Sequence, residues 1–135
     1  MNTGTERLQL EHRRGTETIL FVEDEESLRV VVSDFLSQLG YTVLSAANGK
    51  EAVVLGKSYS GNIDLLLTDV IMPEMTGPEL AETLLASRPS LKIMYVSGYA
   101  ENTLELHGAL GSGVLLQKPF TIKSLTLKLR EILES

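Results

Sequence analysis

Short apolar runs alternate with longer amphipathic segments from Thr18 to the end of the chain. There are five such runs, and several of them are apolar almost throughout, which is typical of parallel strands that are covered on both faces. They occupy residues 19–22, 41–44, 63–67, 91–96 and 114–116. Because parallel strands are joined by right-handed crossovers, this alternation predicts an α/β domain with a parallel sheet and helices on both faces.

The segment after the first run has the clearest helical period. Its apolar residues recur at steps of three and one, which predicts one buried stripe, and Gly40 follows as a C-terminal stop. The predicted stripe consists of Leu28, Val31, Val32, Phe35, Leu36 and Leu39.

The next two helices have recognisable starts. Asn48 with Glu51, and Thr76 with Glu79, are spaced as an N-cap residue and its capping-box partner. Each pair therefore predicts a helix that begins directly after the cap.

The last helix is expected over residues 122–133, with Thr121 as its cap. Its predicted inward residues are Leu125, Leu129, Ile132 and Leu133. A further helix over residues 100–110 has the weakest pattern, because three glycines loosen its end. These glycines are Gly108, Gly111 and Gly113.

Length and composition fit one domain. The chain has 135 residues, of which 43% are hydrophobic and 22% charged, and this is a globular composition. Residues 1–17 are polar and lack a sustained apolar period. We therefore expect a flexible leader or linker at 1–17 and one folded domain at 18–135.

The formal net charge of −6 argues against nucleic acid and anionic membranes as partners, because both select basic surfaces. The chain has no cysteine, which excludes disulfides, thiolate catalysis and cysteine-ligated zinc. His12 and His107 have no partner at metal-ligand spacing. No apolar run approaches the roughly 18 residues that span a bilayer, and the polar N-terminus is unlike a signal peptide. We expect a soluble cytoplasmic domain.

Acidic residues gather where two predicted strands end. Glu23 and Asp24 follow the first strand, and Asp69 ends the third. Ligands of open parallel sheets bind outside the carboxyl ends of the strands. If the first and third strands are neighbours, three carboxylates converge, which is unfavourable unless a cation lies among them. With oxygen ligands alone, Mg²⁺ is the natural candidate.

Ser97 and Lys118 follow the fourth and fifth strands at the same end of the sheet. Taken singly, each of these residues fits an ordinary loop or surface position. A carboxylate beside Mg²⁺, a lysine and a small hydroxyl together have the groups needed to accept a phosphoryl group, with the carboxylate as nucleophile.

Four motifs occur in order along the chain: ILFVEDE at 19–25, LLTDVIMPEMTG at 66–77, VSGY at 96–99 and KPF at 118–120. Together they resemble the response-regulator receiver domain, the phosphorylation-switched module of two-component signalling. The resemblance implies a flavodoxin-like, doubly wound sheet of five parallel strands in the order 2-1-3-4-5. It also implies a phospho-acceptor switch rather than an enzyme.

The resemblance assigns roles to individual residues. Asp69 matches the phospho-acceptor, and Ser97 and Lys118 match the groups that contact the phosphoryl group. The Gly98 backbone N–H would be a further donor to it. The metal ligands would be Asp24, Asp69 and the Ile71 carbonyl, with Glu23 acting through water, around Mg²⁺ or, as a substitute, Mn²⁺. A cis bond is expected between Lys118 and Pro119.

Two residues depart from the family pattern. Glu23 stands where aspartate is more frequent, and Leu115 stands where the family often has a tyrosine or phenylalanine that swings inward on activation. We therefore expect that the usual aromatic readout of phosphorylation is altered in this chain. Tyr99 is a candidate to take the place of the missing aromatic side chain.

The resemblance implies a sensor histidine kinase or a phosphotransfer protein as partner. The phrases VSGYAE at 96–101 and LQKPF at 116–120 are similar to receivers of hybrid histidine kinases. We expect a free-standing receiver or a part of such a kinase, and these phrases favour the second. Leu127 lies off the inward stripe of the last helix, and Leu104 and Leu106 cannot both face inward. The face of helix 100–110, the fifth strand and the last helix is therefore a candidate for self-association.

Two alternatives stay open at this point. A phosphohydrolase with Asp69 as transient nucleophile would need a second acid and a substrate cap, but Val70 and Ile71 follow Asp69 directly and no cap-sized insertion exists. A pseudo-receiver that only binds partners would be compatible with Leu115 and Glu23. The intact set of Asp24, Asp69, Ser97 and Lys118 argues against it.

Overall fold

The computed structural model of the chain describes residues 14–98 and 113–135. Its strands form one parallel sheet in the order β2-β1-β3-β4-β5, which confirms the predicted order. The strands are β1 (Thr18–Val22), β2 (Thr42–Ala46), β3 (Leu65–Asp69), β4 (Lys92–Ser97) and β5 (Val114–Gln117). The described helices are α2 (Glu26–Gln38), α3 (Gly49–Ser58), α4 (Gly77–Ser87) and α6 (Ile122–Leu133).

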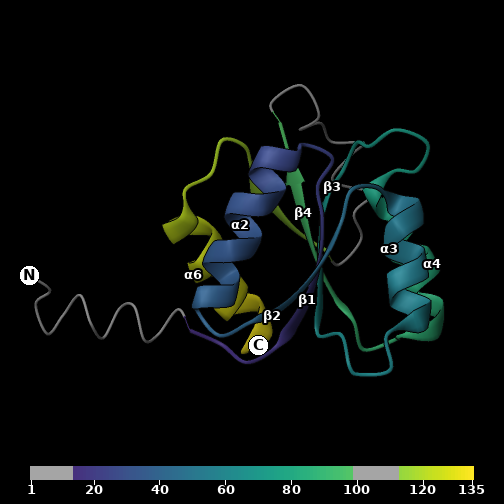
Figure 1. The fold of residues 1–135 in the computed structure, drawn as a ribbon, viewed down its shortest axis with the longest axis horizontal. Coiled ribbons are helices and arrows are strands. Elements are labelled where there is room, and N and C mark those ends of the chain that lie inside the picture. The colour runs from purple at the N-terminus through teal and green to yellow at the C-terminus, as the bar shows by residue number, and fades with distance from the viewer. Residues whose placement is uncertain (1–13, 99–112) are drawn as a thin grey trace, which may run out of the picture.

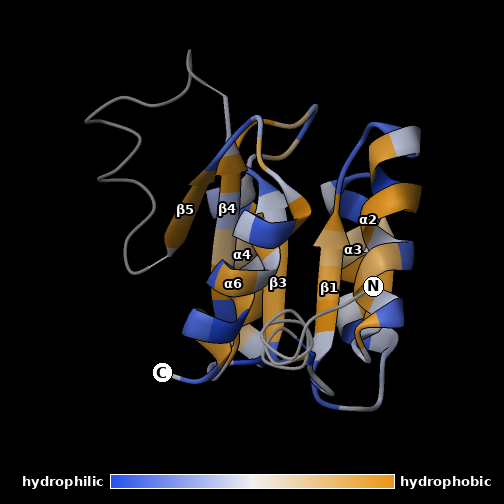
Figure 2. Ribbon diagram, turned by 90° about the vertical axis from the view of Figure 1, so that its left-hand side faces the viewer, coloured by the Kyte–Doolittle hydropathy of each residue, from blue (hydrophilic) through white to orange (hydrophobic). Residues whose placement is uncertain are grey.

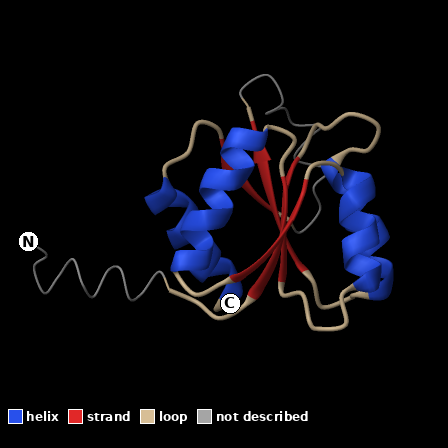
Figure 3. Ribbon diagram, viewed as in Figure 1, coloured by secondary structure: helices blue, strands red, loops and turns tan. Residues whose placement is uncertain are grey.

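The helices cover both faces of the sheet, as predicted. Helices α2 and α6 lie on one face, and α3 and α4 lie on the other (Figures 1 and 3). None of the described helices is both long and apolar enough to cross a membrane. The helix expected over 100–110 lies outside the described residues.

Alternate residues of the inner strands face two separate cores. In β1, Ile19 and Phe21 pack toward α2 and α6, whereas Leu20 and Val22 pack toward α3 and α4. All four are buried, and the inner strands are accordingly hydrophobic along their length (Figure 2). Burial on both faces explains why these strands are continuous apolar runs without polar alternation.

The predicted stripe of α2 is wrong at one position. Val32, Leu36 and Leu39 are buried, but Val31 is 60% exposed. Successive helix residues point about 100° apart, and because α2 turns Val32 and Leu36 toward the sheet, Val31 points away from it.

The helix caps agree with the predictions except in one detail. Thr76 and Glu79 form a complete capping box, and Thr121 caps α6 through the Ser124 N–H. The Asn48 side chain accepts from the Glu51 N–H at 2.8 Å, as predicted. The Glu51 carboxylate, however, accepts from the N–H of Ala47, one residue before the cap.

Candidate functional site

The ends of two neighbouring strands bring three carboxylates together. β1 pairs with β3 so that Val22 is level with Thr68, and the next residues are Glu23 and Asp69. Carboxylate oxygens of Glu23, Asp24 and Asp69 lie within 4.8 Å of one another and could hold a metal ion. The predicted convergence of these three residues, called the acidic cluster below, is confirmed.

Burial makes the negative charge of the acidic cluster costly. Glu23 is 2% exposed and Asp69 is 7% exposed, whereas Asp24 is exposed. Burial, together with the nearby charge of Asp69, raises the pKa of Glu23 to about 7. Burial also raises the pKa of Asp69, although Lys118 opposes the shift. A bound cation is favourable under these conditions, and carboxylate oxygens are the ligands that Mg²⁺ prefers.

Lys118 supplies positive charge to the acidic cluster. It follows β5, and its Nζ lies 3.0 Å from Asp69 Oδ1 and 3.4 Å from Glu23 Oε1. Its N–H donates to the Ser97 carbonyl at 2.7 Å, which ties it to the end of β4. Burial by itself lowers the pKa of Lys118, but its bond with Asp69 and the charges of both carboxylates raise it. The Lys118–Pro119 bond is cis, as expected.

Ser97 ends β4 next to Val96, which is level with Asp69. Its side chain is buried, and no described residue makes a hydrogen bond with its Oγ. An unpaired buried hydroxyl costs about 1–3 kcal/mol, so a ligand oxygen that accepts from it would recover that free energy. The space where a Cβ of Gly98 would lie is open.

The backbone after Asp69 turns tightly against the start of α4. The Gly77 N–H donates to the Val70 carbonyl at 2.7 Å, and a Cβ at Gly77 would clash with the Asp69 carbonyl oxygen. Sequence reasoning missed this contact, although a glycine directly after the cap Thr76 was a signal, because glycine is a poor helix former. The Ile71 side chain is 56% exposed on this turn. The role of the Ile71 carbonyl as a metal ligand stays a prediction.

The other residues singled out in the sequence differ in where the structure places them. Leu115 is half-buried and packs against the core between the sheet and helices α3 and α4. Leu127 is 41% exposed, as predicted. Five residues lie outside the described part of the chain: His12, Tyr99, Leu104, Leu106 and His107.

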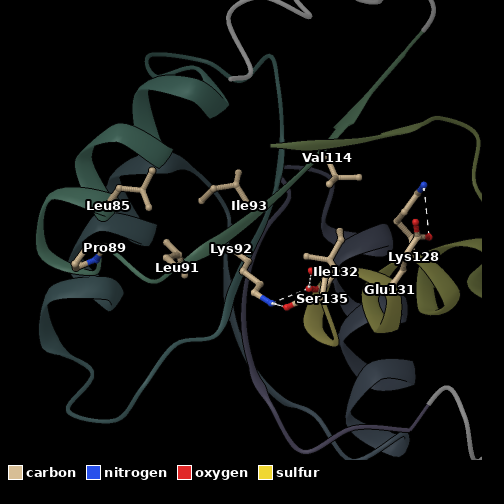
Figure 4. A pocket seen from close by; sticks show the side chains of 10 residues that line it. All are labelled: Leu85, Pro89, Leu91, Lys92, Ile93, Val114, Lys128, Glu131, Ile132 and Ser135. Carbon is tan, nitrogen blue, oxygen red and sulfur yellow. Dashed lines mark hydrogen bonds and ion pairs between the residues drawn. The ribbon is translucent and has the colours of Figure 1, made fainter. Parts of the chain in front are cut away.

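A pocket of about 560 Å³ lies away from the acidic cluster, between the end of α4 and helix α6 (Figure 4). Lys92 Nζ donates to the carbonyls of Ile132 and Ser135 at 2.9 and 3.0 Å and thereby satisfies the C-terminal end of α6. Lys128 and Glu131 lie 3.9 Å apart on the same helix. These charged groups are already paired within the chain, so the acidic cluster is the stronger candidate for chemistry.

Comparisons with known proteins agree with this geometry. A family model described as the response regulator receiver domain matches residues 19–130. The chain is similar to the sensor kinase CckA of Brucella abortus, with 40% identity over 121 residues, which are 89% of this chain and 13% of that protein. It is also similar to the response regulator receiver protein CpdR of Brucella abortus, with 34% identity over 116 residues, which are 85% of this chain and 95% of that protein.

A solved structure gives the same result. The crystal structure of the receiver domain from the hybrid histidine kinase CckA superposes with a TM-score of 0.73 and 35% identity. The match covers 86% of this chain and 98% of that one. The similarity therefore spans nearly all of a receiver domain and a small part of full-length CckA.

Proposed function

The chain belongs to the response-regulator receiver family, and we propose on this basis that it accepts a phosphoryl group on Asp69 from a kinase phosphohistidine. Receiver domains are phospho-acceptor switches of two-component signalling. The observation that carries the proposal is the acidic cluster, with Lys118 Nζ 3.0 Å from Asp69 Oδ1. In this proposal Asp69 would be the nucleophile, Glu23 and Asp24 would be the further acids of the metal site, and Lys118 would be the cation for the phosphoryl oxygens, all at the carboxyl end of the sheet.

Receiver domains bind Mg²⁺ through acidic residues, and the donor set of this chain fits that ion. Asp24, Asp69 and the Ile71 carbonyl would hold it directly, and Glu23 would act through water. When bound, Mg²⁺, or Mn²⁺ in its place, offsets the negative charge of the phosphoryl oxygens. The raised pKa of Glu23 supports this assignment, because the chain's own groups do not fully stabilise the cluster.

In the proposed reaction, an Asp69 carboxylate oxygen attacks the phosphorus atom, and the bond from phosphorus to the imidazole nitrogen breaks. The electron pair of that bond stays on the imidazole, and an aspartyl phosphate forms. The Lys118 ammonium donates to a phosphoryl oxygen. The buried hydroxyl of Ser97 and the Gly98 N–H would be further donors, and the unpaired state of Ser97 Oγ supports this role.

The phosphorylated domain would control a partner by a shift in conformation. Receiver domains interact with histidine kinases or phosphotransfer proteins, and either would be the phosphoryl donor here. We place the domain at residues 18–135 in the cytoplasm, with 1–17 as leader or linker, within a hybrid kinase or a free-standing regulator. The candidate surface for self-association is formed by β5 and α6 and includes the exposed Leu127. Residues 100–110, which were predicted to complete it, lie outside the described residues.

This domain would act as a phospho-acceptor without substrate turnover. Asp69 would keep its phosphoryl group long enough to signal and would not release it in repeated cycles of ester hydrolysis. Repeated hydrolysis of phosphate esters by the purified chain would favour the phosphohydrolase alternative.

The test is phosphorylation by a small phosphodonor. The chain is incubated with Mg²⁺ and acetyl phosphate and then weighed intact, and we expect the added mass of one phosphoryl group. Asp69→Asn should gain none, whereas Asp34→Asn, which removes an exposed acid from α2, should react like the unmodified chain. No mass gain in the unmodified chain, or the same gain in Asp69→Asn, would contradict the proposal.

A further inference from the structure

Arg29 lies beside the acidic cluster, and the proposed reaction does not use it. It lies near the start of α2, and its side chain is half-buried. Its Nη1 donates to the backbone carbonyl oxygen of Glu23 at 2.7 Å, and its own N–H donates to the Glu25 carbonyl at 2.9 Å. The side chain therefore folds back over the loop that carries Glu23 and Asp24.

This position is unfavourable for a cation that has no specific partner. The N-terminal end of a helix carries partial positive charge and favours acidic side chains. An arginine near carboxylates commonly binds them with two parallel hydrogen bonds. Here Lys118 pairs with the carboxylates, and the hydrogen bond of Arg29 goes to a backbone carbonyl. The charge of Arg29 thus lies near the acidic cluster without occupying a carboxylate oxygen.

The carbonyl that Arg29 binds belongs to the rigid peptide unit that links Glu23 to Asp24. A restraint on this oxygen fixes the orientation of the peptide plane, and it therefore also fixes the direction in which the Asp24 backbone continues. Glu23 is held by other contacts as well, since its N–H donates to the Ala46 carbonyl at 3.1 Å and its Oε2 accepts from the Glu25 N–H at 3.0 Å. Arg29 therefore adds a restraint on the side of the loop where the exposed Asp24 lies.

We propose that Arg29 is a positioning residue for the metal site, because it holds the Glu23–Asp24 peptide unit so that the Asp24 carboxylate faces the cation. The inference rests on the proposed function, since it assumes that the acidic cluster binds Mg²⁺. Loss of positioning by Arg29 and loss of its charge would change the Mg²⁺ affinity in opposite directions. Removal of a positive charge near a cation site strengthens cation binding by Coulomb's law, whereas loss of positioning weakens it.

The first measurement is the Mg²⁺ affinity, determined by isothermal titration with magnesium chloride. Arg29→Met keeps the aliphatic stem and removes the charge and the donors, and we expect about tenfold weaker binding, as is typical for residues that orient metal ligands. Arg29→Lys keeps the charge and a donor, and should stay within about threefold of the unmodified chain. The matched control is Lys57→Met, which removes one exposed charge at the C-terminal end of α3 and should leave the affinity unchanged.

The second measurement needs no metal. Hydrogen exchange of the Asp24 and Glu25 amides, followed by NMR, should be faster in Arg29→Met than in the unmodified chain and near normal in Arg29→Lys. If Arg29→Met does not fold, Arg29→Gln replaces it, because its amide keeps a donor but not the charge. Its loss of affinity should be smaller.

The inference would be overturned if Arg29→Met, or Arg29→Gln in its place, bound Mg²⁺ as tightly as the unmodified chain or more tightly. If the unmodified chain itself binds no Mg²⁺, the proposed function fails instead. Amide exchange then tests only whether Arg29 restrains the Glu23–Asp24 peptide unit, and unchanged exchange in the substituted chain would overturn that restraint as well.

Discussion

The acidic cluster and a second group of charged side chains lie at opposite ends of the sheet. The second group, called the arginine cluster here, consists of Arg130, Glu17 and Tyr41. Glu17 precedes β1, Tyr41 precedes β2, and Arg130 lies near the C-terminal end of α6. Arg130 Nη1 is 2.7 Å from Glu17 Oε1 and 3.2 Å from the Tyr41 hydroxyl. One cation thus joins three parts of the chain that are far apart in sequence.

The glutamates of the two clusters have opposite pKa shifts. Burial raises the pKa of Glu23 to about 7 in the acidic cluster. Burial also acts to raise the pKa of Glu17. The hydrogen bond from Arg130, the backbone N–H groups of Glu17 and Thr16, and the charge of Arg130 together outweigh burial, and the pKa of Glu17 falls below its usual value. Burial alone therefore does not mark a functional site. The distinguishing feature is whether the chain's own cation offsets the cost of burial, as it does for Glu17, or offsets only part of it, as Lys118 does for Glu23 and Asp69.

The largest expected effect follows from removal of the cation of the acidic cluster. In Lys118→Met, phosphorylation of Asp69 should slow by about 100-fold, because a donor aimed at the charge of the transition state is lost. The rate is measured by intact mass during incubation with Mg²⁺ and acetyl phosphate. Lys123→Met, which removes an exposed lysine from α6, is the control. A similar rate in Lys118→Met and the control would contradict the role of Lys118.

Removal of the cation of the arginine cluster should affect stability and not phosphorylation. The Arg130 side chain is 11% exposed, and Arg130→Met would leave Glu17 and Tyr41 without this donor. We expect the free energy of unfolding to fall by about 2–3 kcal/mol, measured by urea denaturation. Arg130→Lys should recover part of the loss. An unchanged urea midpoint, or slower phosphorylation at unchanged stability, would contradict the comparison.

The sequence predicts the sheet and the acidic cluster because both depend on local patterns. Apolar runs locate the strands, and acids at the ends of two strands that become neighbours must converge. The exact strand bounds depend on hydrogen-bond register, so the third strand, predicted at 63–67, is observed at Leu65–Asp69. The exposure of Val31 depends on the rotation of α2 about its own axis relative to the sheet, and the spacing of the apolar residues of α2 does not specify this rotation.

Side-chain partners far apart in sequence leave no comparable pattern. Glu17, Tyr41 and Arg130 each fit an ordinary surface or core position when read alone, and only the folded chain brings them together. The contact of Arg29 with the Glu23 carbonyl is closer in sequence. A basic residue near the start of a helix, where acids are favoured, was a signal for it.

The pH dependence of stability should differ between the clusters, and the acidic cluster should give the larger effect. The pKa of Glu23 is about 7 in the folded chain against a usual value of 4.5. The folded state therefore binds more protons than the unfolded state between these values, and stability falls as the pH rises through this window. Without Mg²⁺, we expect a loss of roughly 1–3 kcal/mol between pH 5 and pH 8 from this source.

Urea denaturation at both pH values, with a chelator and then with Mg²⁺, measures this effect. Glu23→Gln should reduce the pH dependence in the chelator, and Mg²⁺ should reduce it in the unmodified chain. The difference in the pH dependence of stability between Glu23→Gln and the unmodified chain gives the contribution of Glu23, separate from the general repulsion among the charges of an acidic protein. An equal pH dependence in both chains would show that Glu23 ionises normally.

The smallest expected effect has the opposite sign and arises in the arginine cluster. Because the pKa of Glu17 lies below its usual value of 4.5 in the folded chain, its ionised form stabilises the fold above that pH, and this contribution is lost as the pH falls through the lowered pKa. Glu17→Gln should therefore be about 1 kcal/mol less stable than the unmodified chain at pH 7, and the difference should shrink as the pH falls below 4.5 and through the lowered pKa.

Glu134→Gln is the matched control for Glu17→Gln. Glu134 Oε1 also lies 3.1 Å from Arg130 Nε, but its side chain is 50% exposed, so water and salt screen the pair and the loss should be smaller. Urea midpoints of both variants across the acid range measure the difference. If the two substitutions have equal effects at pH 7, or if the effect of Glu17→Gln persists unchanged into acid, then Arg130 does not hold Glu17 as an ionised partner. The contrast between a fully and a partly compensated cluster is then lost.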